Sequence, residues 1–153
     1  MASGDFYVVD SRSETVTPTP YQTKAGQTAI KVGEWVVQDT AGDVEYVVGA
    51  ADGAANTSVW VGVAASNDTV TASADGTVMV YDKPQYLFRG LPTTASNLAA
   101  TLINTQVTLD VTTGVQTIDE NDVTNGTLIV RGFNAGRGTI DVQMAQTDHI
   151  SQG

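Results

Sequence analysis

Hydrophobic and polar residues alternate with a period of two in several short segments of this chain. VTLDV from Val107, TLIVRG from Thr127 and TIDVQM from Thr139 each place Ile, Leu, Val or Met on one side and Thr, Asp, Gln or Arg on the other. This alternation is typical of a strand with one buried face and one face in water. The sequence therefore predicts half-buried strands at these three places.

Four other segments are apolar over most of their length. Strands that are covered on both faces, or that lie near the centre of a sheet, carry such runs because neither face meets water. The sequence predicts buried strands in EWVVQD from Glu34, VEYVVGA from Val44, SVWVGVAA from Ser58 and TVMVYD from Thr77.

Turn signals separate these segments. Asn-Gly and Asp-Gly pairs accept the positive φ angles of tight hairpin turns. Strands that recur about every 8 to 12 residues across such turns are typical of an antiparallel sandwich or barrel. We therefore expect a single all-β domain, built as a small antiparallel β-barrel or sandwich. The signals are TAGD at 40–43, DG at 52–53 and 75–76, NG at 125–126 and NAGRG at 134–138.

One segment has a helical pattern. In TTASNLAATLIN, from Thr93 to Asn104, Leu98 and Leu102 are four residues apart, and Ser96 or Thr94 can cap the start of a helix. The sequence therefore predicts one short helix here.

The N-terminal region is polar and contains two Thr-Pro pairs, which end at Pro18 and Pro20. Proline excludes helix and restrains the residue before it to extended conformations. We expect an extended N-terminal arm over 1–25, a β-rich domain over 26–146 and a flexible C-terminal tail over 147–153. An edge strand from Phe6 to Val9 is the alternative for the first ten residues.

Length and composition restrict the possible functions. With 153 residues, the chain is long enough for one hydrophobic core. The absence of cysteine excludes disulfides, thiolate metal sites and a cysteine nucleophile. A formal net charge of −10 argues against nucleic acid and anionic membranes as partners, since both require a cationic surface.

No apolar run approaches the roughly 18 to 20 residues of a membrane span. The start, MASGDFYVVD, has neither a basic region nor an apolar segment of the signal-peptide kind. We expect a chain that is made and used without export, so the sequons at Asn56, Asn67 and Asn125 carry little weight.

Catalytic motifs are nearly absent. The only histidine, His149, lies four residues from the C-terminus, where a side chain is seldom oriented for catalysis. There is no Gly-x-Ser-x-Gly elbow and no phosphate-binding loop. We expect no enzymatic activity, no catalytic residue and no cofactor.

Two motifs resemble functional sites in part. DENDVTNG, from Asp119, has the oxygen ligands of a calcium loop, but Thr124 and Val130 occupy the positions where such a loop needs Gly and Glu. We expect turns there and no metal site. The run from Gly138 resembles the Gly-x-Ile-Asp-x-x-Tyr motif of trimeric deoxyuridine triphosphatases, but Met144 replaces the Tyr and no other motif of that family is present.

The stretch YDKPQYLFRGLP, from Tyr81 to Pro92, concentrates aromatic, basic and proline residues. It has two interpretations. In the first, Tyr86 and Phe88 continue the core-facing pattern of the preceding strand after a bend, and Arg89 is solvated. In the second, Tyr86, Phe88 and Arg89 form a partner contact, because binding hot spots are enriched in Tyr, Trp and Arg.

Taken in order, the motifs resemble the capsid decoration, or structural cement, proteins of tailed bacteriophages. The resemblance covers most of residues 25 to 145. It rests on the polar arm, the strand Gly33–Val37, the run ending Val61–Val63, the hairpin arm Asp75–Val80, the segment Tyr81–Pro92 and the runs GVQTID, NGTLIVRGFN and TIDVQM from Gly114 onward.

This resemblance implies a function without an active site. Such proteins bind the outer surface of the assembled shell of the major capsid protein and staple its subunits. It implies a location on the capsid surface of the virion, with the host cytoplasm before assembly, and self-association as a trimer or dimer. Contacts are expected from Pro18, Pro20 and Tyr21 of the arm and from the segment around Arg89.

A β-sandwich module that binds a ligand such as carbohydrate is the alternative function. It would use Trp35 or Trp60 as a stacking platform, which requires an exposed indole face. Both residues lie in Val-rich runs, so we expect them in the core.

Overall fold

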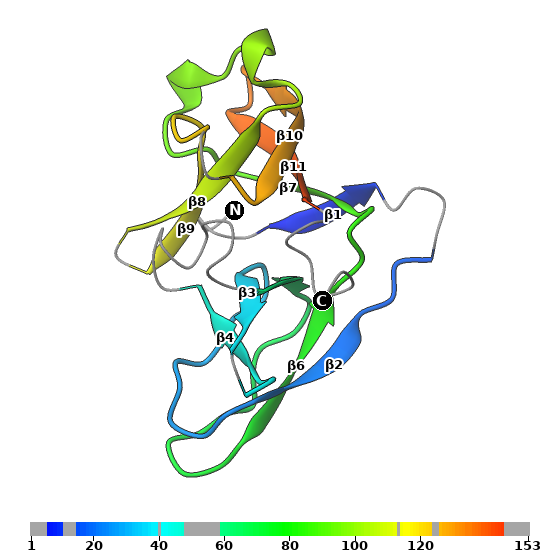
Figure 1. Ribbon diagram of the computed structural model, residues 1–153, viewed down its shortest axis with the longest axis vertical. Helices are drawn as coiled ribbons and strands as arrows, with labels where there is room; N and C mark the ends of the chain where they lie inside the picture. Colours follow the sequence, from blue (N-terminus) through cyan, green and yellow to red (C-terminus); the bar gives the residue numbers. More distant parts are fainter. Residues whose placement is uncertain are drawn as a thin grey trace.

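The structure is a computed structural model that describes residues 6–10, 15–39, 41–47, 59–112, 114–123 and 126–145. These residues form two antiparallel sheets, with the six-stranded sheet above the five-stranded sheet in Figure 1. The all-β prediction is confirmed. The six-stranded sheet has the order β1 (Tyr7–Asp10), β7 (Leu87–Gly90), β11 (Thr139–Met144), β10 (Leu128–Asn134), β8 (Gln106–Thr112), β9 (Val115–Asp119). The five-stranded sheet has the order β2 (Thr19–Thr23), β6 (Gly76–Tyr81), β5 (Val59–Ala64), β3 (Trp35–Gln38), β4 (Val44–Tyr46).

The five-stranded sheet curls on itself. Its two edge strands, β2 and β4, lie in contact but are not hydrogen-bonded as neighbours. The sheet is therefore curved without closing, and the sandwich, not the barrel, describes the molecule.

The strand predictions agree with the observed burial in β11, β3 and β5. They do not agree in β4, an edge strand with Glu45 exposed, or in β6, which alternates between buried and less buried positions. β11 alternates between partly exposed and buried positions, as the period-two pattern of TIDVQM predicted. β3 and β5 are buried on both faces, as their apolar runs predicted, because the five-stranded sheet covers a hydrophobic cluster on each side.

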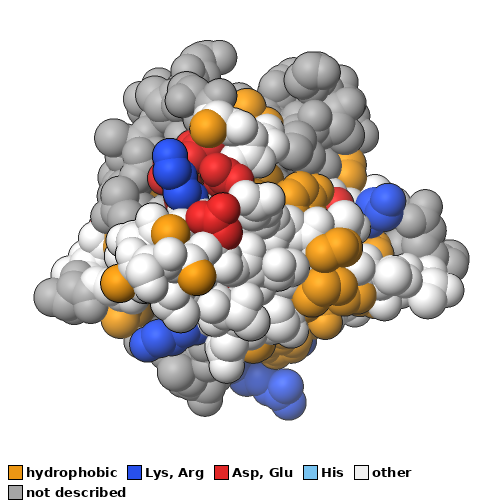
Figure 2. Space-filling model, turned by 90° about the horizontal axis from the view of Figure 1, so that it is seen from below, with side chains coloured by type: hydrophobic (Ala, Val, Ile, Leu, Met, Phe, Trp, Pro, Cys, Tyr) orange, Lys and Arg blue, Asp and Glu red, His pale blue; other side chains and the backbone are white. Residues whose placement is uncertain are grey.

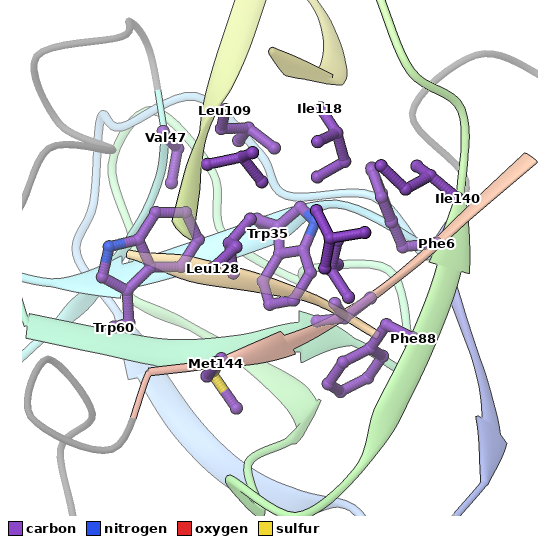
Figure 3. Close-up of a cluster of buried hydrophobic side chains, with 14 of the residues drawn as sticks. Phe6, Trp35, Val47, Trp60, Phe88, Leu109, Ile118, Leu128, Ile140 and Met144 are labelled. Atoms are coloured by element: carbon purple, nitrogen blue, oxygen red, sulfur yellow. The ribbon is translucent and has the colours of Figure 1, made fainter. Parts of the chain in front are cut away.

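The larger cluster, the inter-sheet core, fills the space between the two sheets (Figure 3). Trp35 lies at its centre, in edge contacts with the rings of Phe6, Trp60 and Phe88 at centroid distances of 5.5, 5.4 and 5.0 Å. Edge-to-face packing at this spacing is favourable beyond the area that it buries. The members are Phe6, Trp35, Val37, Val47, Trp60, Val63, Tyr86, Phe88, Leu98, Leu102, Val107, Leu109, Ile118, Leu128, Val130, Ile140, Val142 and Met144.

The smaller cluster, the inner core, lies on the opposite face of the five-stranded sheet, inside its curl. It contains aliphatic side chains, with Tyr21 and Tyr46 packed against it as partly buried neighbours. The members are Ile30, Val36, Val44, Val61, Ala64, Val78 and Val80.

The predicted helix over Thr93–Asn104 is wrong. The structure has two single 3-10 turns there, η1 (Ala95–Asn97) and η2 (Ala100–Leu102), with extended backbone at Ala99 between them. Tertiary contacts override the weak helical pattern. Leu98 and Leu102 both reach the inter-sheet core, and the Glu120 carboxylate binds the amides that would begin the helix.

The expected N-terminal arm is described over 6–10 and 15–25, and there it belongs to the sheets. β1 pairs with β7, and β2 pairs with all of β6 except its last residue. Phe6 is buried, and a Cβ atom at Gly90 would overlap its ring, so the strand and the glycine fit each other closely. The edge-strand alternative for the first ten residues therefore describes Tyr7–Asp10.

Candidate functional site

The segment from Tyr81 to Pro92 is the crossover between the two sheets. β6 ends at Tyr81, the Tyr86 amide donates to the Lys83 carbonyl at 3.1 Å to close a turn, and β7 begins at Leu87. The unusual composition of this segment therefore accompanies a change of sheet.

Tyr86 and Phe88 lie inside the molecule, with no exposed surface. They alternate with Leu87 and Arg89 along β7, so they face the inter-sheet core while their neighbours face outward. The interpretation as a core strand is confirmed for these two side chains. Neither can contact a partner from this position. Of the three residues in the expected partner contact, only Arg89 remains at the surface.

The Tyr86 hydroxyl holds the N-terminal segment. It donates to the Thr15 carbonyl at 3.2 Å and lies 3.3 Å from the Thr17 amide, which donates to it. A buried phenol with a hydrogen-bonded hydroxyl is typical of tyrosine in cores. The crossover and the segment that leads into β2 are thus fixed to each other.

Arg89 faces outward but is already paired. Its Nε donates to Asp141 Oδ1 at 2.7 Å and its Nη2 to Asp141 Oδ2 at 3.0 Å, across the β7–β11 pair. This hydrogen bonding raises the pKa of Arg89; burial lowers it, and the charge of Asp141 and the neighbouring Tyr7 raise it further. Asp141 belongs to the run from Gly138 that resembles the deoxyuridine triphosphatase motif. In this structure its carboxylate is the partner of an arginine within the sheet.

Pro18, Pro20 and Tyr21 lie before and in β2, at the edge of the five-stranded sheet. Pro20 is exposed, and the Tyr21 hydroxyl donates to Asp82 Oδ2 at 2.7 Å. Burial, followed by the hydrogen bond to Asp82 and its charge, raises the pKa of Tyr21 well above its usual value. These residues are on the other sheet from Arg89, so the structure does not join the expected contact residues into one patch.

A hollow of about 400 Å³ lies beside β2 and β6. Pro20, Tyr21 and Gln22 line it from β2, and Asp75, Gly76 and Thr77 line it from the start of β6. Gln22 Nε2 donates to Asp75 Oδ2 at 3.1 Å, which ties the two strands together at this end. Three of the residues that line this hollow follow one another in β2, and two of them, Pro20 and Tyr21, are expected contact residues.

Both tryptophans are fully buried. Neither indole N–H has a hydrogen-bond partner within the described part of the chain, and Trp60 belongs to the inter-sheet core beside Trp35 (Figure 3). The stacking platform of the carbohydrate-binding alternative is therefore absent at these two residues.

The acidic run from Asp119 forms turns, as expected. The buried Glu120 carboxylate accepts from the Thr93 and Thr94 amides, both at 3.1 Å, and from Asn97 Nδ2 at 3.0 Å. Asp119 Oδ1 accepts from the Asn121 amide at 3.1 Å. These carboxylates bind backbone amides of the neighbouring turns, so their oxygens are used by the protein itself.

Other carboxylates fasten loops to strands. Asp68 accepts from the Thr23 hydroxyl at 2.7 Å and from the Val70 amide at 2.9 Å, and Asp75 Oδ1 accepts from the Ala25 amide at 2.9 Å. Over the residues that the structure describes, no group of three or more His, Cys, Asp and Glu side chains is placed to hold a metal ion.

Several sequence features lie outside the described residues: His149, the sequons at Asn56 and Asn125, the DG turn at 52–53 and the tail over 147–153. Asn67 is described, and its side-chain oxygen accepts from the Val32 amide at 3.1 Å. Among the described residues, no helix has the length and apolar character that a membrane span requires.

Sequence reasoning missed two polar residues. Gln116 is buried between the sheets, where it accepts from the Trp35 amide at 2.6 Å and donates to the Trp35 and Val47 carbonyls at 3.2 and 3.3 Å. Arg131 is exposed on β10 and is held by Gln143 and Asn104. The partners of both are distant in sequence, so no local pattern could have indicated them.

Comparison with protein-family models, with curated proteins and with solved structures finds no match for this chain.

Proposed function

We propose that this chain is a capsid decoration protein of a tailed bacteriophage, without enzymatic activity, that binds the outer surface of the assembled shell. The observation that carries the proposal is how the described carboxylates are used. Asp68, Asp75 and Glu120 accept hydrogen bonds from loop and turn groups, and Asp141 pairs with Arg89. Side chains used this way give a rigid β module that acts through its surfaces, and the sequence resemblance indicates a shell as the partner.

The mechanism is stabilisation by linkage. A protein that binds the assembled lattice and not the separate subunits shifts the equilibrium towards the intact shell. A rigid module loses little conformational entropy on binding, so more of its contact energy remains for the shell. In this proposal the partners are the major capsid protein and neighbouring copies, on the virion surface after a period in the host cytoplasm.

The hollow beside β2 and β6 is the proposed contact with the shell. Pro20 presents an exposed apolar ring there, and it has no amide hydrogen that would have to find a partner. The bonds from Tyr21 to Asp82 and from Gln22 to Asp75 hold its lining in place. The contact surface is therefore formed before binding.

Electron microscopy of shells tests the proposal. Shells of the phage that encodes this chain, prepared without it, would be incubated with the wild-type chain, with Pro20→Asp and with the matched control Val123→Asp. Val123 is also exposed, at 50%, but lies outside the hollow. We expect added density with the wild type and Val123→Asp, and weak or absent density with Pro20→Asp.

The two parts of the proposal fail separately. Bare shells after incubation with the folded wild-type chain would reject the decoration function. Equal occupancy by all three proteins would keep the function and reject the hollow as the contact.

A further inference from the structure

The three arginines that the structure describes all belong to the six-stranded sheet and its hairpin. Arg89 lies in β7, Arg131 in β10 and Arg137 in the turn between β10 and β11. Their environments differ. Arg89 and Asp141 form the only ion pair between the described residues, whereas Arg131 and Arg137 are exposed.

Arg131 is held in place by neutral groups. Its Nε donates to Gln143 Oε1 at 3.1 Å, and its Nη1 donates to Asn104 Oδ1 at 2.7 Å. Two amide oxygens fix the plane of the guanidinium without cancelling its charge. Since a guanidinium presents a rigid fork of donors that suits a carboxylate, Arg131 is oriented and charged in the way that favours such a partner.

Asn104 takes an unusual backbone conformation to reach Arg131. It has a φ of 68°, the one positive φ of a non-glycine residue in the described part of the chain. Asn tolerates this region better than most residues, but the conformation still has a cost and is often found at functional positions. The turn that follows η2 thus places the side-chain oxygen of Asn104 next to the Arg131 guanidinium.

A hollow of about 330 Å³ lies next to Arg131. Ile129, Met144 and Pro84 line it together with Arg131 and Gln143. A cation at the side of a hollow with both polar and apolar lining suits a carboxylate that is accompanied by an apolar side chain. This combination defines the chemistry of the occupant.

We propose that a second copy of this chain supplies that occupant, through the acidic surface of its five-stranded sheet. The described residues from 15 to 82 carry seven carboxylates and two lysines, whereas those from 83 to 145 carry five carboxylates, one lysine and all three described arginines. In the view from below the five-stranded sheet, Figure 2 shows most of the visible acidic side chains in one group, with a basic side chain beside them. The acidic residues of this part are Glu34, Asp39, Asp43, Glu45, Asp68, Asp75 and Asp82, of which Asp68, Asp75 and Asp82 also accept hydrogen bonds from within the chain.

The contact joins two different surfaces, the face around Arg131 on one copy and the acidic sheet on the next. Such a head-to-tail contact forms a ring when its rotation closes and a filament when it does not. The contact needs no shell, so it stands or falls independently of the proposed function.

Sedimentation of the purified full chain tests the contact. Arg131→Gln removes the charge, and Arg137→Gln is the matched control because it makes the same change on the same hairpin. Among the described residues, the Arg137 guanidinium has no hydrogen-bond partner, and its backbone amide donates to Asn134 Oδ1. The wild type and Arg137→Gln should associate as concentration rises. The dissociation constant of Arg131→Gln should be at least about tenfold higher than that of the wild type, which corresponds to about 1.4 kcal/mol. This difference should shrink at high salt.

A zero-length cross-link identifies the partner surface. Arg131→Lys places an amine at the same position, and a carbodiimide joins amines to adjacent carboxylates. In a mixture of isotope-labelled and unlabelled copies, we expect cross-links between copies from position 131 to carboxylates within residues 34–82. A chain that stays monomeric up to its solubility limit, equal association of Arg131→Gln and wild type, or cross-links between copies only to the six-stranded sheet would each overturn the proposal.

Discussion

The inter-sheet core and the inner core are built from different side chains on the two faces of one sheet. β3 supplies both: Trp35 and Val37 enter the inter-sheet core, and Val36 enters the inner core. The inter-sheet core contains both tryptophans and the edge contacts of Trp35 with Phe6, Trp60 and Phe88, whereas the inner core has no aromatic residue among its fully buried members.

The difference follows from what each core must join. The inter-sheet core spans the distance between two sheets, about 10 Å when sheets pack face to face, and large rings fill this space. The inner core lies within the curl of a single sheet, where small branched side chains suffice. Loss of a large ring should therefore loosen the attachment of one sheet to the other, and loss of a methyl group should only relax the curl.

The largest expected effect is at Trp35. Trp35→Ala should lower the free energy of unfolding by about 3–5 kcal/mol, because it leaves a cavity where three rings meet. Ile30→Val in the inner core should cost only about 0.5–1.5 kcal/mol. Urea unfolding measures both, and Trp35→Phe gives a folded comparison if the alanine variant does not fold. Similar losses for Trp35→Ala and Ile30→Val would remove the distinction between the two cores.

The polar part of the inter-sheet core should come next. Gln116→Leu leaves one backbone amide and two carbonyls without their partner in a dry region, and each such group costs about 1–3 kcal/mol. We expect a total loss of at least about 2 kcal/mol, on the same scale. The control is Gln106→Leu, an exposed change on β8 that should stay within about 0.5 kcal/mol of the wild type. A neutral result for Gln116→Leu in urea unfolding would show that water or repacking replaces these bonds.

The smallest effect concerns the rim of the inner core and depends on pH. The pKa of Tyr21 is raised in the folded chain, so folding retains its proton. The stability that this proton provides is complete below the ordinary tyrosine pKa of about 10 and is lost as the pH rises above it. Tyr21→Phe should therefore flatten the fall of stability above about pH 10, at a cost near neutral pH of about 1 kcal/mol for the lost hydrogen bond.

Tyr46 provides the control for this measurement. Burial, and then the charge of Glu34, also raise its pKa, but no hydrogen bond to a carboxylate contributes. Tyr46→Phe should therefore flatten the alkaline fall less than Tyr21→Phe does. Denaturant unfolding at a series of pH values compares the two, and an unchanged slope in Tyr21→Phe would show that Tyr21 ionises as readily in the folded chain as in the unfolded one.

Much of this fold could be predicted from local patterns. Alternation over TIDVQM gave the buried and exposed sides of β11, and the continuous runs around Trp35 and Trp60 gave strands that are covered on both faces. Those runs are apolar because each strand serves two cores. The segment Thr93–Asn104 misled the prediction because Glu120, which shapes it, lies at least sixteen positions further along the chain.

The candidate site was less predictable, since exposure depends on what packs on a residue. Tyr86 and Phe88 follow the same alternation as the other strands, and that pattern favoured the core over a partner contact. Arg89 was expected in a partner contact because binding hot spots are enriched in arginine, but Asp141 on the neighbouring strand already pairs with it. Arg131 was not predicted as a site residue, because its two side-chain amide partners lie in a different strand and in a distant turn.

The position of β11 determines when the six-stranded sheet can form. β11 pairs with β7 on one side and with β10 on the other, so it joins the pair β1–β7 to the group β10–β8–β9. Until residues 139–144 have left the ribosome, these two parts of the sheet share no strand, and the edge of β7 stays open. Because such distant pairings form slowly and expose strand edges while they wait, a nascent chain has to keep its apolar strands from other chains until this late strand arrives.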